Sequence, residues 1–169
     1  MAFPKPDEAA PHYFTYINRI SGDNIVEVLE SQLRDVTSLL SGVSEEKSLH
    51  RYAPEKWSIR QVLSHVNDTE RVFAFRALWF GRGFSDPLPS FDQNASVTAA
   101  RADEYSWGDR VREFQKIREA TLAYFRNLPD DAWARSGIAS GNSVTVNALS
   151  YTIAGHVAHH IAILQQRYL

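Results

Sequence analysis

The fold is decided by the stretch SIRQVLSHVNDTERVFAFRALWF, residues 58–80. Apolar side chains recur in it every three or four positions, which is the periodicity of one face of an α-helix. Its first four residues, Ser58 to Gln61, read as a capping box, in which the serine hydroxyl and the glutamine side chain each accept a hydrogen bond from the other residue's amide. The helix is expected to run to about Phe80, because a Gly-Arg-Gly sequence follows at 81–83.

Three further segments have the same helical periodicity. The predicted helices run from about Asn24 to Leu40, from about Ser106 to Leu128, and from about Thr145 to the C-terminus. Asp23 is the expected N-cap of the first, and Pro129 marks the end of the second. Residues 129–133 are expected to add a short helical turn, and no segment has a convincing strand pattern. The sequence therefore predicts an all-α fold, a four-helix bundle in which residues 1–169 form a single domain.

A long connection, residues 81–105, joins the second and third predicted helices. Short loops favour antiparallel neighbours, whereas a connection of this length can carry the chain back along the bundle to start a parallel helix. It contains Pro87 and Pro89 and is expected to be an ordered loop. Loops of this length in a compact domain are usually functional or flexible.

Composition narrows the classes of function. A chain of 169 residues with 44% hydrophobic and 22% charged residues is typical of one globular domain. Its formal net charge of -2 provides no broad basic field for nucleic acid, and no apolar stretch is long enough for a membrane span. The N-terminus has no secretory signal pattern, so a cytoplasmic location is expected. The chain has no cysteine, so any metal must be bound through nitrogen or oxygen.

Two histidines of the last predicted helix share one face. His156 and His160 are one turn apart, about 40° in projection, and both face the apolar side. Side chains at this spacing can converge on one ion at about 2.0–2.1 Å from each ring nitrogen. His159 projects about 100° away from His160 and is the poorer candidate. His65, on the inward face of the helix at 58–80, is the third candidate ligand; the alternative is that these histidines are hydrogen-bonded core residues.

Two carboxylates are candidates for a catalytic role. Glu70 projects near the centre of the apolar face of its helix, where a carboxylate is costly unless it is paired or hydrogen-bonded. It is expected to support a ligand histidine, to act as a general base, or to form an internal salt bridge with an arginine of a neighbouring helix. Asp92, in the long connection, is expected to fold over the site as an acid or to cap a turn or helix. Arg71, Arg76 and Arg82 are interpreted as a solvated or paired face that an anionic substrate can exploit.

The sequence resembles the DinB/YfiT-like family of four-helix metalloproteins. The resemblance rests on residues 51–66, 69–78 and 87–93, and on residues 154–164, which contain a Gly-His-x-x-His-His pattern. It covers most of the chain, and the combination of this pattern with the histidine of the second helix makes it specific. The resemblance implies an up-down-down-up bundle and a divalent metal site at the matching positions, His65, His156 and His160.

Three neutral imidazoles leave an ion with an open coordination position and make it a Lewis acid. The expected cofactor is one divalent ion, zinc or nickel. The resemblance favours S-transfer from a low-molecular-weight bacterial thiol to a small-molecule substrate, because relatives are similar to thiol-dependent transferases and isomerases. The alternatives are a metal-dependent hydrolase that uses water and a non-catalytic metal-binding stress protein. Nucleic acid and membranes are not expected partners, and the oligomeric state stays open, with a homodimer as one alternative.

Overall fold

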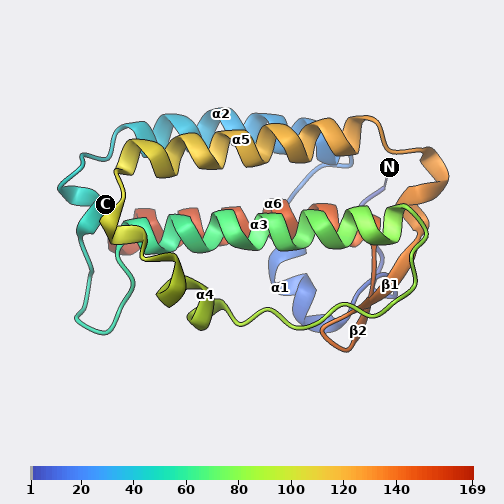
Figure 1. Ribbon diagram of the computed structural model, residues 1–169. Coiled ribbons are helices and arrows are strands. Elements are labelled where there is room, and N and C mark those ends of the chain that lie inside the picture. Colours follow the sequence, from blue (N-terminus) through green and yellow to red (C-terminus); the bar gives the residue numbers. More distant parts are fainter. Residues whose placement is uncertain (1) are drawn as a thin grey trace.

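The four predicted long helices are present and form a bundle (Figure 1). A computed structural model of the protein describes residues 2–169, and residue 1 of the predicted domain lies outside the described residues. The long helices are α2 (Ile25–Ser41), α3 (Ile59–Gly81), α5 (Trp107–Arg126) and α6 (Val146–Arg167). The shorter elements are α1 (Phe14–Ile17), α4 (Gln93–Ala100) and 3-10 helices at Pro11–Tyr13, Lys47–Leu49, Ala102–Glu104 and Asp130–Ala134. The prediction of an all-α bundle is confirmed, with a small sheet in addition.

Each long helix begins at a side chain that caps its N-terminus. At α3 the predicted capping box is present: Ser58 accepts from the Gln61 amide, and Gln61 accepts from the Ser58 amide. The caps of α5 and α6 are Ser106 and Thr145. The N-cap of α2 is Asn24 instead of the predicted Asp23, because the Asn24 side chain accepts from an amide in the first turn. These caps fix where each helix starts and therefore which face it turns inward.

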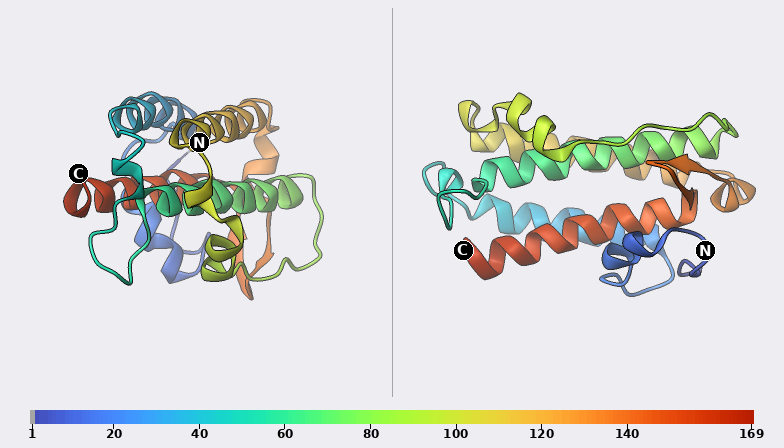
Figure 2. Two further views of the ribbon diagram at one scale, coloured as in Figure 1. Left: turned by 60° about the vertical axis from the view of Figure 1, so that its left-hand side comes forward. Right: turned by 90° about the horizontal axis from the view of Figure 1, so that it is seen from below.

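The helices run up-down-down-up, as expected (Figure 1). α2 and α5 form one layer of the bundle and α3 and α6 form the other, and each helix also contacts one helix of the opposite layer. Because α3 and α5 run in the same direction, residues 82–106 return the chain along the length of the bundle. This connection, expected as an ordered loop, includes helix α4. Both α1 and α4 lie on the outer side of the α3/α6 layer (Figure 2).

A β-hairpin that the sequence does not predict precedes α6. β1 (Ser136–Ala139) pairs antiparallel with β2 (Asn142–Thr145), and the two turn residues, Ser140 and Gly141, both have positive φ, 52° and 76°. Strands of four residues are too short for an alternating pattern to stand out. The Leu88 amide donates to a β1 carbonyl at 2.9 Å, and the Leu88 carbonyl accepts from the Ser140 amide at 3.1 Å. The hairpin thereby holds the long connection in place.

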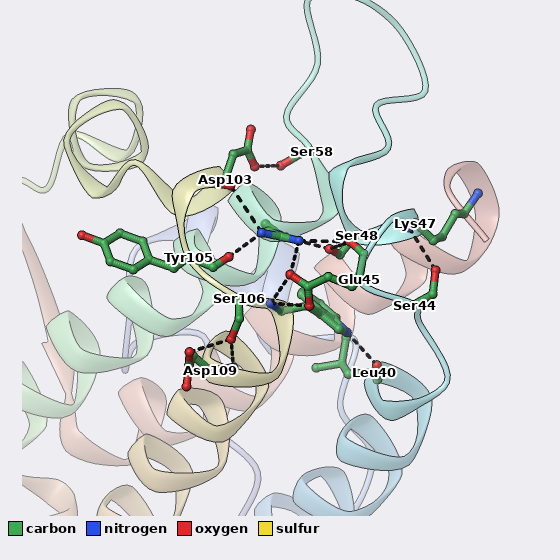
Figure 3. Close-up of polar contacts among 12 residues, drawn as sticks. Leu40, Ser44, Glu45, Lys47, Ser48, Ser58, Asp103, Tyr105, Ser106 and Asp109 are labelled. Atoms are coloured by element: carbon green, nitrogen blue, oxygen red, sulfur yellow. Dashed lines mark hydrogen bonds and ion pairs between the residues drawn. The ribbon is translucent and has the colours of Figure 1, made fainter.

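A buried arginine, Arg60, ties the start of α3 to the loops around it, and its partners Glu45 and Tyr105 are labelled in Figure 3. Arg60 donates to the Tyr105 carbonyl and to the Glu45 carboxylate. Glu45 also accepts from the Trp107 amide at 3.0 Å, so the same carboxylate caps the first turn of α5. These contacts fix the N-terminal end of α3, the end that carries the candidate metal ligand.

Buried apolar side chains form two clusters along the bundle. One includes Phe80, Phe125 and Leu149, toward the hairpin, and the other includes Leu40, Leu63 and Phe114, toward the opposite end. Between the positions of these clusters on α3 and α5 lie Glu70 and Arg118, which form an ion pair. The bundle therefore contains a charged pair in its middle.

Candidate metal centre

Three histidines from two antiparallel helices meet inside the bundle. His65 of α3 and His156 and His160 of α6 offer ring nitrogens that all lie within 4.8 Å of one another. The Nε2 atoms of His65 and His156 are 3.0 Å apart. His65 and His156 are 3% and 4% exposed, and His160 is half-buried. The one-turn spacing on α6 and the inward face of α3 thus bring all three rings to one point.

The arrangement fits a divalent metal ion. Two nitrogens bound at about 2.0–2.1 Å to a tetrahedral ion are about 3.3 Å apart, close to the 3.0 Å between His65 and His156. Imidazole is a suitable ligand for both zinc and nickel. Among the described residues the group contains no carboxylate, so it would leave the ion its full charge and a position for an external ligand.

Burial keeps the three rings neutral at pH 7. Removal from water lowers the pKa of His65 to about 4 and the pKa of His160 to about 3, from 6.5. The pKa of His156 also lies well below 6.5, first because of burial and then because of the neighbouring His160 and His65. A neutral ring keeps a lone pair for a metal, so protons compete with an ion only at acidic pH.

Two further side chains hold the His65 ring. The Thr69 hydroxyl, one turn further along α3, lies 3.3 Å from Nδ1 of His65, and the Trp57 ring lies 5.1 Å away between centroids. If Nε2 bound a metal ion, Nδ1 would carry the proton and donate to the Thr69 hydroxyl, the kind of contact that usually orients ligand histidines. Thr69 could have been identified from the sequence, because it follows His65 by four residues on the same helix. Trp57, which precedes the helix, has no such signal.

Thr69→Val is expected to weaken metal affinity about 10- to 100-fold. Valine has nearly the shape of threonine but cannot accept the proton of Nδ1, so the His65 ring loses its orientation. Competition with a chromogenic chelator measures the affinity. Thr69→Ser, which keeps the hydroxyl, is the matched control and should bind the ion almost as the unaltered protein does. Unchanged affinity in the valine variant would show that Thr69 does not orient His65.

The N-terminal segment packs directly on α6 beside the histidines. A Cβ at Gly155 would lie 2.1 Å from the carbonyl oxygen of Tyr16, so a side chain does not fit at this position. The Tyr16 ring contacts the rings of His156 and His159, at 5.3 and 5.5 Å between centroids. The residues of α1 therefore form a wall of the site that helical periodicity in the sequence does not predict.

The other residues considered in the sequence lie outside the histidine group. His159 is half-buried, and its ring nitrogens are not part of the group. Glu70 is buried and accepts from Arg118 through both carboxylate oxygens, each at 2.8 Å, which is the internal salt bridge among its alternatives. Asp92 is exposed and caps α4 by accepting from two amides, at 2.9 and 3.1 Å. Neither carboxylate forms a hydrogen bond with the three histidines among the described residues. A catalytic role for either one stays a prediction.

A pocket of about 190 Å³ opens onto the histidine group. His65 and His156 lie in its wall, which continues along α3 through Thr69 and Phe73 to Arg76. The N-terminal segment and the long connection supply the facing wall, including His12, Tyr13, Tyr16, Phe91 and Gln93. Among the described residues, no aspartate or glutamate lines this pocket.

Comparison with known proteins places the chain in a family. Residues 29–164 match the family described as the DinB superfamily. The chain belongs to the DinB superfamily. The matched range contains all three histidines of the group, and the resemblance found in the sequence is confirmed. The comparison with curated proteins found no match.

Solved structures of two proteins share the DinB fold of this chain. YfiT from Bacillus subtilis, described as a probable metal-dependent hydrolase with an unusual four-helix bundle topology, has a TM-score of 0.70 at 20% identity, and the match covers 85% of each chain. A mycothiol-dependent maleylpyruvate isomerase has a TM-score of 0.70 at 13% identity, and a mutant of it has 0.69. The match covers 86% of this chain and 61% of the isomerase. At these identities the likeness supports the fold alone.

None of the helices in residues 2–169 is both long enough and apolar enough to cross a bilayer.

Proposed function

We propose that this DinB protein is a metal-dependent enzyme that activates a low-molecular-weight thiol for S-transfer to a small electrophile. The observation that carries the proposal is the group of three neutral, largely buried imidazoles beside a pocket. His65, His156 and His160 would hold one divalent ion, zinc or nickel. When bound, the ion supplies Lewis acidity, which lowers the pKa of a thiol at its open position.

The pocket wall supports a thiol over water as the nucleophile. A free thiol has a pKa of about 8.5, so a modest shift makes it a thiolate at pH 7, whereas hydrolases commonly add a carboxylate general base for water. No carboxylate lines this pocket among the described residues, and Val72, Phe73 and Phe91 provide apolar surface. Because the chain has no cysteine, the thiol must come from outside. An external thiol has a precedent in this fold, since the isomerase is described as mycothiol-dependent.

A metal-dependent hydrolase is the second candidate. YfiT is described as a probable metal-dependent hydrolase, and its match covers 85% of this chain and 85% of YfiT. In that case His12, from the N-terminal segment, is a side chain of the pocket wall outside the histidine group that can take a proton from water.

Cobalt-substituted protein distinguishes the candidates. Titration with mycothiol is expected to produce a saturable near-ultraviolet charge-transfer absorption, because a thiolate ligand absorbs there and water and imidazole do not. A chloronitrobenzene is then added. A carbon–sulfur bond forms, the carbon–chlorine bond breaks, chloride leaves with the electron pair, and the thiol proton passes to solvent.

The control is His156→Ala, in which both the absorption and the thioether product should be lost. Hydrolysis of an ester, amide or phosphoester panel without any thiol absorption would reject S-transfer in favour of the hydrolase. The absence of both would favour a non-catalytic metal-binding protein.

A further inference from the structure

Arg76 is the buried arginine that lacks a carboxylate partner among residues 2–169. Three arginine side chains are buried in the structure: Arg60, Arg76 and Arg118. Arg60 pairs with Glu45, and Arg118 pairs with Glu70. Arg76 is also buried, at 4% exposed, but its hydrogen bonds within the described residues go to uncharged groups. A buried cation without a counter-ion is costly, so its position calls for a source of negative charge.

The expectation that Arg71, Arg76 and Arg82 form one solvated or paired face is wrong for Arg76. Arg71 and Arg82 are exposed, and Arg71 pairs with a glutamate of α5. The long connection and the hairpin cover Arg76, whose Nη2 donates to the Pro89 carbonyl at 2.8 Å and to the Ser140 hydroxyl at 2.9 Å. Both partners are uncharged, so they orient the guanidinium without neutralising it.

Arg76 lies on the same face of α3 as His65. Eleven residues separate the two, which is about three helical turns and about 16 Å along the axis. Long side chains on a helix lean toward its N-terminus, so the arginine extends toward the histidines. Both residues line the pocket, with the Phe73 ring between its two ends: it lies 5.7 Å from Cζ of Arg76 and 6.2 Å from the His156 ring.

We propose that this pocket binds a small organic carboxylate, with Arg76 as the residue that takes the charged group. The other end of this ligand would face the histidine group, and its reaction there rests on the proposed function, whereas the anion site does not. A guanidinium donates charge-assisted hydrogen bonds to a carboxylate, and the two partners of Arg76 occupy Nη2, which leaves the N–H groups of Nε and Nη1 for such a ligand. The pocket wall holds no lysine and no second arginine among the described residues, so one negative charge is matched and a phosphoryl dianion is not.

The size of the pocket limits the size of the ligand that it can hold. A protein cavity of about 150 Å³ accommodates benzene, and this pocket, of about 190 Å³, is somewhat larger. Its aromatic lining, Tyr13, Tyr16, Phe73 and Phe91, suits a flat or unsaturated carbon skeleton. The expected substrate is therefore an acid of roughly the size of benzoate, with its electrophilic group away from the carboxylate.

Benzoate is the probe, titrated into the full-length protein as purified and again after zinc loading, with binding followed by ligand-observed NMR. Saturable binding is expected in both forms. Benzamide has the same shape without the charge and should bind about tenfold or more weakly, as expected for the loss of a hydrogen bond to a charged group. Phenylphosphonate should also bind more weakly than benzoate. Tighter binding of phenylphosphonate would overturn the assignment to carboxylates.

Arg76→Met should reduce benzoate affinity at least about tenfold, and Arg76→Lys should restore part of it. Arg82→Met is the matched control: it removes the same charge from an exposed position at the end of α3 and should leave benzoate binding unchanged. Equal binding to the Arg76→Met variant would overturn the proposal. Should that variant not fold, equal binding of benzoate and benzamide to the unaltered protein would overturn it as well. If benzoate binds but the cobalt protein shows no thiol absorption, the proposed S-transfer is rejected and the anion site is kept.

Discussion

Replacing His156 by alanine is expected to reduce the metal content of the purified protein from about one ion per chain to near zero. The His156 ring lies against both other rings of the group, at 4.9 Å from the His65 ring and 4.5 Å from the His160 ring between centroids. Its loss leaves two imidazoles on different helices, which are a weak chelate. Elemental analysis of protein prepared without a metal-affinity tag measures the content and also identifies zinc or nickel.

His159→Ala is the matched control on the same helix. Its ring contacts Tyr16 and His160, but its nitrogens lie outside the group of three. The variant should therefore keep most of the metal. Loss of the ion in His159→Ala, with retention in His156→Ala, would mean that α6 presents a different face to the site.

The helices can be predicted from the sequence because each carries local signals. The capping box at Ser58 fixes the start of α3, and hydroxyl caps at Ser106 and Thr145 start α5 and α6. The hairpin lacks comparable signals, since its strands have four residues each and one of its turn residues with positive φ is Ser140 instead of glycine. The contact of the hairpin with Leu88 depends on segments far apart in the sequence, which no local pattern describes.

The residues of the candidate site also fall into those that the sequence predicts and those that it does not. The spacing of His156 and His160 within one helix, and the register of His65, could be predicted because they depend on helix geometry. The place of Tyr16 beside the histidines and the burial of Arg76 could not, because they depend on the N-terminal segment and the long connection folding back over α6 and α3. The burial of Glu70 followed from its helical projection, but the choice of its partner required the packing of α3 against α5.

Arg118→Met is expected to lower the free energy of unfolding by about 3–5 kcal/mol, because it leaves the Glu70 carboxylate buried without its counter-charge. The two side chains are 0% and 2% exposed. Arg118 donates to Glu70 from Nε and Nη2, and to the side chain of Gln32 from Nη1, each at 2.8 Å. One substitution therefore disrupts contacts among three helices. Urea denaturation followed by circular dichroism measures the change.

The double variant, Glu70→Leu with Arg118→Met, separates the charge from the packing. Replacing both members of a buried pair by apolar side chains of similar volume is often neutral or stabilising, so much of the lost stability should return. It also tests the remaining role proposed for Glu70, since a general base cannot be replaced by leucine. A double variant that regains stability, binds its metal and still forms thioether would leave Glu70 a purely structural role. A stable, metal-loaded double variant without turnover would instead mean that this carboxylate takes part in the reaction, despite its pairing with Arg118.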